Sequence, residues 1–317
     1  MEVFMNRNDN SNPLVTVLMP VFNSPDIFLS IDSVLNQEYR PIQFIIIDDC
    51  SETFAEDSIR KYIINYPNCD QVAVTIMQNV QNMGTVYTMN KGLMYSKGKY
   101  VFNLSGDDAF ADKKVLNDWV QAFEGSDYKI ITARRYNYDN KMERVIGTSP
   151  SKKSIYYLQN LSSGQLFEIF AEENLISGAS TAWDLAFLKE LGGFDKDYRL
   201  IEDYPLYLKI LREGVKIGFL NRFVINYRGG GISSEVQEFS SVYESDYKKI
   251  FENEIIPYTK YPDAAKGRLR RWESNIRFNQ WYYKCCYNNK NNLVVLFLLK
   301  CLYYFRHPKK VFSKYTK

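Results

Sequence analysis

The chain has 317 residues, 45% of them hydrophobic and 24% charged, which is enough apolar material for one large domain or for a domain with an appendage. The five cysteines show no metal-ligand spacing, and their odd number argues against a disulfide framework. A single histidine argues against a histidine-rich zinc site. The start of the chain is too polar for a signal peptide and no apolar run reaches the length of a bilayer span, so we expect a cytoplasmic protein.

The first 102 residues alternate between strand-like and helix-like patterns. The predicted elements are buried strands at residues 14–19, 42–47, 72–77 and 100–102, with amphipathic helices between them at residues 26–37, 56–66 and 85–96. Asp26 is the expected N-cap of the first helix. Strands that alternate with helices predict an α/β fold, with a mostly parallel sheet and helices on both of its faces.

The pattern changes beyond residue 129. The predicted elements there are a hairpin at residues 134–146, helices at residues 162–173, 185–191 and 203–212, and a strand at residues 176–181. The glycine-rich stretch 227–234 predicts a flexible loop, which is a candidate lid. We therefore expect a catalytic domain over residues 1–225, followed over residues 226–317 by a flexible loop and basic, aromatic helices.

The charge is unevenly distributed along the chain. Residues 274–317 contain nine Lys and Arg residues and no Asp or Glu, so this tail has a formal charge of +9. Because the whole chain has a net charge of +3, the other residues sum to −6. Residues 293–305 are apolar nearly all round. This combination predicts a helix that lies on an anionic membrane surface, or alternatively one that packs on the catalytic domain or in a dimer. No recognised RNA or DNA module surrounds the charge, so we expect no nucleic-acid partner.

Candidate ligand-binding segments follow three of the predicted strands, at residues 20–23, 48–49 and 106–108. Ligands of open α/β sheets bind beyond the carboxyl ends of the strands, so we expect these segments to converge on one crevice. Adjacent carboxylates repel each other and must be solvated, paired or bound to a metal. A polar turn would explain Asp107 and Asp108 alone, but three converging segments favour a binding site.

Hard oxygen ligands indicate the chemistry of this crevice. Mg²⁺ typically binds one or two carboxylates together with substrate phosphates, and Mn²⁺ also suits carboxylates, so Asp107 and Asp108 fit an ion that bridges a diphosphate. Asp49 could accept a hydrogen bond from a base N–H, and residues 20–23 could border the same base. The chain has no G-x-G-x-x-G fingerprint and no P-loop, so neither a dinucleotide-binding fold nor a P-loop fold is indicated.

Short motifs occur in a fixed order between residues 14 and 220. They are Val17-Leu-Met-Pro-Val-Phe-Asn23, Ser33-Val-Leu-Asn-Gln37, Ile47-Asp-Asp-Cys-Ser51, Asn82-Met-Gly84, Asn90-Lys-Gly92, Gly106-Asp-Asp108, Gly192-Gly-Phe-Asp195 and Ile201-Glu-Asp203. As a set they resemble the family 2 glycosyltransferases, which have the GT-A fold and use nucleotide-sugar donors. The resemblance implies a nucleotide-sugar site made of Asp49, for the base, together with Pro20, Val21, Phe22, Asn23, Asn82, Gly84 and Asp107. For Asn82 and Gly84 the alternative is that they shape their loop without contacting the ligand.

The resemblance also implies where the chemistry occurs. Asp108, with Asp107, matches the family's metal-binding pair for Mn²⁺ or Mg²⁺, and Asp203 matches the catalytic base of its inverting members. Glu202 and Trp183 are candidates for the acceptor side, with a helix cap and a core position as their respective alternatives. The family often has Asp-x-Asp where this chain has two adjacent acids, which leaves open which acid contacts the metal first.

The sequence thus predicts an inverting, metal-dependent glycosyltransferase with a nucleotide-diphosphate sugar donor, UDP being the expected nucleotide. The chain lacks the Gln-x-x-Arg-Trp motif and the membrane spans of processive synthases, so we expect transfer of a single sugar. The expected acceptor is a lipid-linked saccharide of bacterial capsule, O-antigen or related surface-polysaccharide synthesis, reached at the inner face of the cell membrane. One alternative is a non-catalytic nucleotide-sugar-binding subunit, in which Asp203 would have no role. The other is a nucleotidyltransferase, which would normally have a glycine-rich, basic loop after the first strand, and residues 21–26 contain no such loop.

Overall fold

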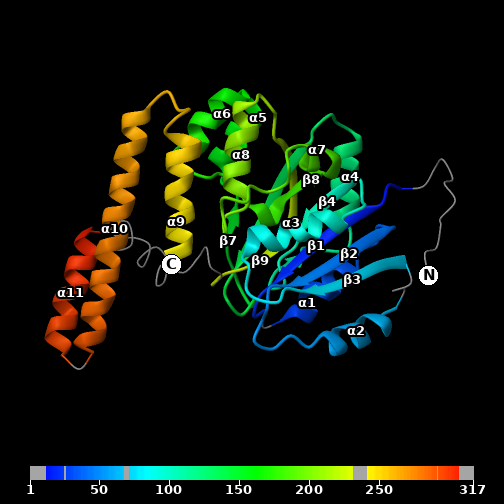
Figure 1. Ribbon diagram of the computed structural model, residues 1–317, viewed down its shortest axis with the longest axis horizontal. Helices are drawn as coiled ribbons and strands as arrows, with labels where there is room; N and C mark the ends of the chain where they lie inside the picture. Colours follow the sequence, from blue (N-terminus) through cyan, green and yellow to red (C-terminus); the bar gives the residue numbers. More distant parts are fainter. Residues whose placement is uncertain (1–11, 25, 68–70, 231–240, 291, 307–317) are drawn as a thin grey trace.

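The computed structural model describes residues 12–24, 26–67, 71–230, 241–290 and 292–306, and within them one mixed sheet is flanked by helices (Figure 1). The strands lie in the order β3–β2–β1–β4–β8–β6–β9–β5, with β7 paired to β6. Their bounds are β1 Val15–Val21, β2 Ile42–Asp48, β3 Val72–Gln78, β4 Tyr100–Asn103, β5 Ala109–Phe110, β6 Ile130–Tyr138, β7 Val145–Ser149, β8 Thr181–Asp184 and β9 Gly218–Arg228.

The first half of the sheet, from β3 to β4, is parallel, as the sequence predicts. The helices that connect its strands are α1 Ile27–Leu35, α2 Glu56–Ile64 and α3 Thr85–Tyr95. All seven residues of β2 are buried, because alternate side chains enter two different cores. Phe44 and Ile46 pack with α1 and α2, whereas Ile45 and Ile47 pack with α3. The elements predicted for this half are confirmed to within two residues at each end.

The second half of the sheet is mixed. β8 lies antiparallel between β4 and β6, and β9 pairs in parallel with β6 and antiparallel with β5. The hairpin expected at residues 134–146 is confirmed as β6 and β7. The strand expected at residues 176–181 is wrong, because Gly178–Ser180 form a 3-10 turn and β8 begins only at Thr181. β9 was not predicted, since Asn221 and Arg222 interrupt its apolar residues.

The remaining helices are α4 Val115–Glu124, α5 Lys152–Asn160, α6 Ser163–Phe170, α7 Leu185–Glu190, α8 Asp203–Arg212, α9 Ser241–Lys249, a π-helix at Ile250–Ile255, α10 Pro262–Asn288 and α11 Leu293–Arg306.

The C-terminal helices begin inside the core of the domain. Ile250, Ala265 and Leu269 are buried in the same core as α8. β9 runs to Arg228, so the first two residues of the expected loop 227–234 are strand, and its residues from 231 onward lie outside the described part.

The last part of the described chain forms a helical hairpin that leaves the domain (Figure 1). α10 has 27 residues, which corresponds to a length of roughly 40 Å. Its first half contributes to the core of the domain, and its second half pairs with α11 around Tyr282, Leu299 and Tyr303. The helix expected at residues 293–305 is therefore confirmed. Among the described residues, no helix is both long and apolar enough to cross a membrane.

Candidate active site

Asp107 and Asp108 lie in the turn after β4, where the sequence predicts the metal-binding pair. Asp108 is only 2% exposed, and its Oδ1 accepts a hydrogen bond from the Arg228 N–H at 2.9 Å. Burial and the charge of Asp107 raise the pKa of Asp108 well above its usual range, although the Arg228 N–H opposes this. The Arg228 side chain donates to the Asp107 carbonyl at 3.1 Å and pairs with Asp26 at 2.7 Å. Asp26 is the N-cap residue of α1, as expected, but its carboxylate makes no cap hydrogen bond and binds the end of β9 instead.

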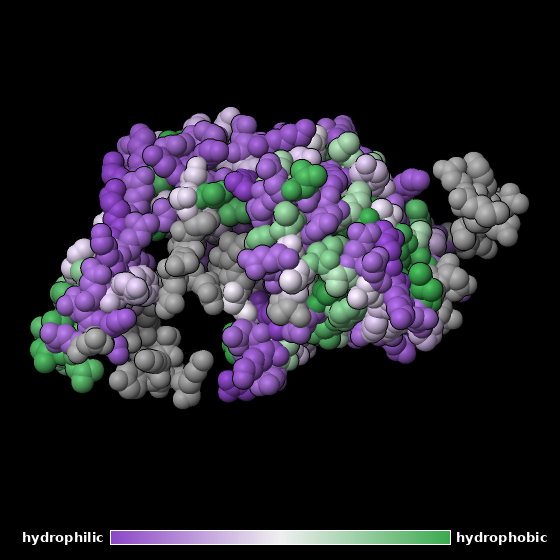
Figure 2. All heavy atoms as spheres, turned by 60° about the horizontal axis from the view of Figure 1, so that its bottom comes forward, coloured by the Kyte–Doolittle hydropathy of each residue, from purple (hydrophilic) through white to green (hydrophobic). Residues whose placement is uncertain are grey.

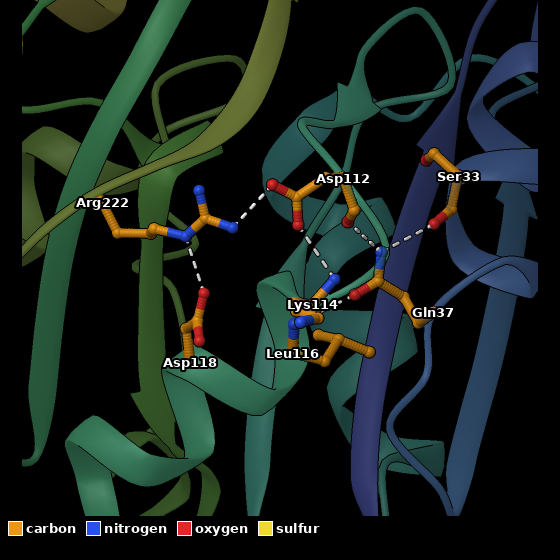
Figure 3. A network of polar contacts seen from close by, with 7 residues as sticks. All are labelled: Ser33, Gln37, Asp112, Lys114, Leu116, Asp118 and Arg222. Carbon is orange, nitrogen blue, oxygen red and sulfur yellow. Dashed lines mark hydrogen bonds and ion pairs between the residues drawn. The ribbon is translucent and has the colours of Figure 1, made fainter.

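The segment that follows the acidic pair is anchored by a polar network (Figure 3). The Gln37 side chain, just after α1, donates to the Asp112 carbonyl at 2.7 Å and accepts from the Leu116 N–H at 3.0 Å. Arg222 of β9 forms ion pairs with Asp112 and Asp118, each at 2.6 Å. Because these contacts tie the segment to α1 and to β9, they fix the position of the turn that carries Asp107 and Asp108.

Asp49 lies at the end of β2 and is only 5% exposed. Its Oδ1 accepts from the Asn79 side chain at 2.7 Å and from the Met83 N–H at 2.8 Å, and its Oδ2 accepts from the Gly84 N–H at 2.8 Å. A carboxylate offers about four acceptor positions, so one of them remains for a ligand. The structure therefore gives Asp49 a role in shaping the loop at residues 79–84, and its fourth acceptor position has no partner among the described residues.

Asn82 and Gly84 shape this loop and dock it on the segment before α8. Gly84 has a φ of +89°, and a Cβ at this position would lie 2.5 Å from the Arg199 Cγ. The Arg199 side chain donates to the Asn82 carbonyl at 2.9 Å and to its side chain at 3.1 Å. Asp246 of α9, itself buried, accepts from the N–H groups of Arg199 and Leu200 at 2.8 and 2.6 Å. The C-terminal region thus supports the site, which the sequence did not indicate.

The segment after β1 borders the same edge of the sheet. Pro20 and Val21 end the strand, and Val21 is buried, whereas the Phe22 side chain is 46% exposed. The Asn23 N–H donates to Ser51 Oγ at 2.8 Å, which joins this segment to the loop after β2. The expected convergence of these two strand ends is therefore present.

Glu202 and Asp203 lie at the start of α8, and both are half-buried. The Asp203 Oδ2 accepts a hydrogen bond from the Gly178 N–H at 2.8 Å. Burial, followed by the charge of Asp203, raises the pKa of Glu202 to about 8. Burial also raises the pKa of Asp203, and the Gly178 N–H opposes that effect. The Glu202 side chain makes no cap hydrogen bond, so the helix-cap alternative is not supported.

Trp183 lies in the core rather than in the crevice. Its side chain is 1% exposed, and its ring stacks on Tyr207 with a centroid distance of 6.1 Å and an interplanar angle of 11°. Of the two interpretations of this residue, the core position fits the structure, because a ring this buried presents no face to an acceptor.

Asp107 and Asp108 offer two adjacent carboxylates as possible metal ligands. Within the described residues, no group of three or more His, Cys, Asp or Glu side chains could hold a metal by itself. Two adjacent carboxylates are nevertheless the donor set with which Mg²⁺ binds substrate phosphates. Burial and the charge of Asp107 raise the pKa of Asp108 more than the charges of Arg135 and Arg228 lower it, so a cation beside the pair would stabilise its charged form. The residues fit an ion that arrives with the diphosphate, rather than one held by the protein alone.

Comparison with known proteins decides the family. Residues 16–174 match the model described as glycosyl transferase family 2. The chain belongs to this family. It is 25% identical over 207 residues to the putative colanic acid biosynthesis glycosyl transferase WcaA of Escherichia coli K12, covering 64% of this chain and 68% of WcaA. It is 33% identical over 107 residues to the putative teichuronic acid biosynthesis glycosyltransferase TuaG of Bacillus subtilis 168, covering 33% and 40%.

Solved structures confirm the expected GT-A fold of this family 2 glycosyltransferase. S. aureus TarS (residues 1–349) in complex with UDP-GlcNAc superposes with a TM-score of 0.57 at 17% identity, covering 87% of this chain and 77% of that one. The Pyrobaculum calidifontis mannosyltransferase PcManGT, in complex with GDP-Man and Mn²⁺, gives 0.56 at 14% identity, covering 97% and 87%. The family match makes the chain a glycosyltransferase, and α10 and α11 give it a C-terminal helical extension.

Proposed function

We propose that this enzyme is an inverting glycosyltransferase that moves a single sugar from a nucleotide-diphosphate sugar to an acceptor hydroxyl. The observation that carries the proposal is the half-buried carboxyl pair at the start of α8. Burial raises the pKa of both Glu202 and Asp203, and the Gly178 N–H orients the Asp203 carboxylate. A carboxylate with a pKa moved towards neutral pH is suited to accept a proton as a general base.

In the proposed reaction, the acceptor hydroxyl gives its proton to Asp203 while its oxygen attacks the anomeric carbon. The bond from that carbon to the donor diphosphate breaks on the opposite side, so the configuration inverts and the diphosphate leaves with the electron pair. General-base assistance of this kind contributes roughly 10²–10⁴-fold. Asp107 and Asp108 would hold Mg²⁺ or Mn²⁺, which would offset the negative charge that develops on the diphosphate.

UDP is the proposed nucleotide, and a saccharide of bacterial surface-polysaccharide synthesis, carried on a lipid, is the proposed acceptor. The remaining acceptor position of Asp49 suits a base that presents an N–H, as uracil does. The ligands of TarS and PcManGT support a nucleoside-diphosphate sugar as the donor class. The names of WcaA and TuaG support the polysaccharide assignment.

Replacing the proposed base tests this function directly. Asp203→Asn keeps the shape of the side chain but cannot accept the proton, so transfer should fall roughly 10²–10⁴-fold while donor binding persists. Release of nucleoside diphosphate would be measured with UDP- and GDP-sugars, Mn²⁺ or Mg²⁺, and a bacterial membrane lipid extract. Asp197→Asn, on an exposed residue of the preceding segment, is the matched control. Near-normal turnover of Asp203→Asn would contradict the assignment of the base.

We also propose that the α10–α11 hairpin rests on an anionic membrane surface, where a lipid-linked acceptor would lie. The face of α11 that points away from α10 is apolar and at least half exposed, and it consists of Leu293, Val294, Phe297, Leu298, Leu302 and Phe305. Figure 2 shows hydrophobic residues gathered at this end of the molecule. Residues 274–306 contain five Lys and Arg residues and no acid. This charge would repel a second copy of the hairpin and complements anionic lipid, which favours a membrane over a dimer.

Vesicle sedimentation distinguishes a membrane surface from a second copy of the chain as the partner of the α10–α11 hairpin. The wild-type chain should bind vesicles that contain phosphatidylglycerol, bind pure phosphatidylcholine weakly, and dissociate as salt rises. Phe297→Asp combined with Leu298→Asp should abolish binding, whereas Met94→Asp, at an 80% exposed position of α3, should not. A concentration-dependent dimer without vesicle binding would identify a second copy as the occupant and overturn the membrane proposal.

A further inference from the structure

Arg135 of β6 is held between two segments of the site that are far apart in sequence. Its Nη1 donates a hydrogen bond to Ser177 Oγ at 2.7 Å. Its guanidinium carbon lies 3.8 Å from the centroid of the Tyr227 ring, a short cation–π contact. The neighbouring Arg134 instead stacks on Phe223 at 4.1 Å, because successive side chains of a strand point to opposite faces of the sheet.

The two segments that hold Arg135 are those that hold the proposed reacting groups. Ser177 directly precedes Gly178, whose N–H donates to the Asp203 carboxylate at 2.8 Å. Tyr227 directly precedes Arg228, whose N–H donates to the Asp108 carboxylate at 2.9 Å. The guanidinium of Arg135 therefore lies between the proposed metal-binding pair and the proposed base.

The protein leaves part of the Arg135 side chain without a partner. Among the described residues Arg135 forms no ion pair, although its charge acts on the Asp108 and Asp203 carboxyl groups. Its Nε is a buried donor with no hydrogen-bond acceptor. The Arg134 Nε is unpaired in the same way, so this donor alone does not single out Arg135. The position of Arg135 between the two acid pairs, as a half-buried cation without an ion pair, is what indicates an anionic ligand. Its positive charge also lowers the pKa of both Asp108 and Asp203, as a smaller cause for each, which agrees with its place between them.

We infer that Arg135 binds the diphosphate of the nucleotide-sugar donor and stays bound to it as it becomes the leaving group. The inference rests on the proposed function, which requires a diphosphate between the two acid pairs. A planar guanidinium can donate two parallel hydrogen bonds to phosphate oxygens, and its charge opposes the negative charge that the leaving diphosphate gains. Arg135 thereby shares with Asp107 and Asp108 the task of neutralising the diphosphate, in a site whose protein ligands for a metal are few.

Nucleotide calorimetry on the full chain tests this assignment. Binding of UDP, UMP and uridine, and of the guanine series, would be measured with Mg²⁺ for the wild type, Arg135→Gln, Arg135→Lys and Arg134→Gln. Arg135→Gln should weaken UDP binding about 10- to 100-fold and leave uridine binding within about twofold. The ratio of UDP affinity to uridine affinity should therefore fall. Arg135→Lys, which keeps the positive charge but not the two parallel N–H donors of the guanidinium, should restore part of this ratio. Arg134→Gln, the same charge change on the opposite face, should keep the wild-type ratio.

The outcomes separate this inference from the function on which it rests. If the wild type binds UDP or GDP and Arg135→Gln keeps the wild-type ratio of diphosphate to nucleoside affinity, Arg135 does not contact the diphosphate and the inference is wrong. An equal loss of UDP and uridine binding would assign Arg135 a structural role, which also overturns it. If the wild type binds no nucleoside diphosphate, the proposed function itself fails first.

Discussion

Gly178 lies against the carboxyl groups of both Glu202 and Asp203. A methyl group added at Gly178 would therefore displace these two carboxyl groups. A Cβ on Gly178 would lie 3.1 Å from the Glu202 Oε1 and 3.2 Å from the Asp203 Oδ2. These contacts are shorter than ordinary van der Waals contacts, so the carboxylates must shift by a few tenths of an ångström. The φ of Gly178 is outside the left-handed region, so Gly178→Ala adds no backbone strain of its own.

The expected loss follows from the hydrogen bond that the shift weakens. A hydrogen bond to a charged group contributes about 1.5–3 kcal/mol, and losing about half of it, about 1 kcal/mol, corresponds to a roughly fivefold fall in kcat. The Gly178 N–H lowers the pKa of Asp203, so weakening this bond raises that pKa. Because the base must be deprotonated, the acidic limb of the kcat profile should move to higher pH, with the KM for the donor unchanged.

The assay is nucleoside diphosphate release across a pH series, with Gly164→Ala as the matched control. Gly164 lies in α6, and a Cβ there would meet no heavy atom within 4 Å, so its variant should keep the wild-type kcat and pH profile. A Gly178→Ala enzyme with wild-type kcat and an unshifted acidic limb would refute the reasoning that Asp203 acts as the base in this position.

Three further outcomes are expected. Glu202→Gln mimics the protonated form that a pKa of about 8 gives Glu202 at lower pH, so the acidic limb of kcat, which Asp203 sets, should keep its wild-type position in the same assay. Gly84→Ala places a Cβ 2.5 Å from the Arg199 Cγ at a φ of +89°, so thermal melting should report a loss of about 1–3 kcal/mol and calorimetry a weaker nucleotide affinity; unchanged values would show that the loop adapts. Chelation with EDTA should abolish turnover, and Mn²⁺ or Mg²⁺ should restore it, whereas full activity in EDTA would exclude the metal role of Asp107 and Asp108.

The parallel half of the fold was predictable because local patterns there match the burial. β2 reads as an uninterrupted apolar run, since both faces of the strand are covered, and its Asp48 marks the edge where the ligand segments meet. The acids of the candidate site were found for the same reason, because Asp49 directly follows β2, and Asp107 and Asp108 lie in the turn after β4. Periodicity also located α8, at whose first residue Asp203 lies.

The missed parts depend on contacts between distant segments. β5 has only two residues and owes its strand conformation to pairing with β9. Arg135 is one of two adjacent arginines in a predicted hairpin, and only its contacts with Ser177 and Tyr227 distinguish it from Arg134. The role of Asp246 follows from hydrogen bonds to a loop 46 and 47 residues earlier, for which the sequence offers no local signal.

The shared core of α8 and the C-terminal helices sets the order in which the chain can fold during synthesis. The core of the catalytic half cannot be completed until residues 250–269 have left the ribosome, because Ile250 and Leu269 pack in the core beneath α8. Asp246, which fixes the loop before Asp203, is also needed. Residues from about 276 onward add the hairpin with its separate core, and one exposed hydrogen bond from Gln280 to Glu244 of α9. A chain that stops at residue 230 should therefore aggregate, whereas one that stops at residue 275 should fold, bind nucleotide and no longer sediment with vesicles.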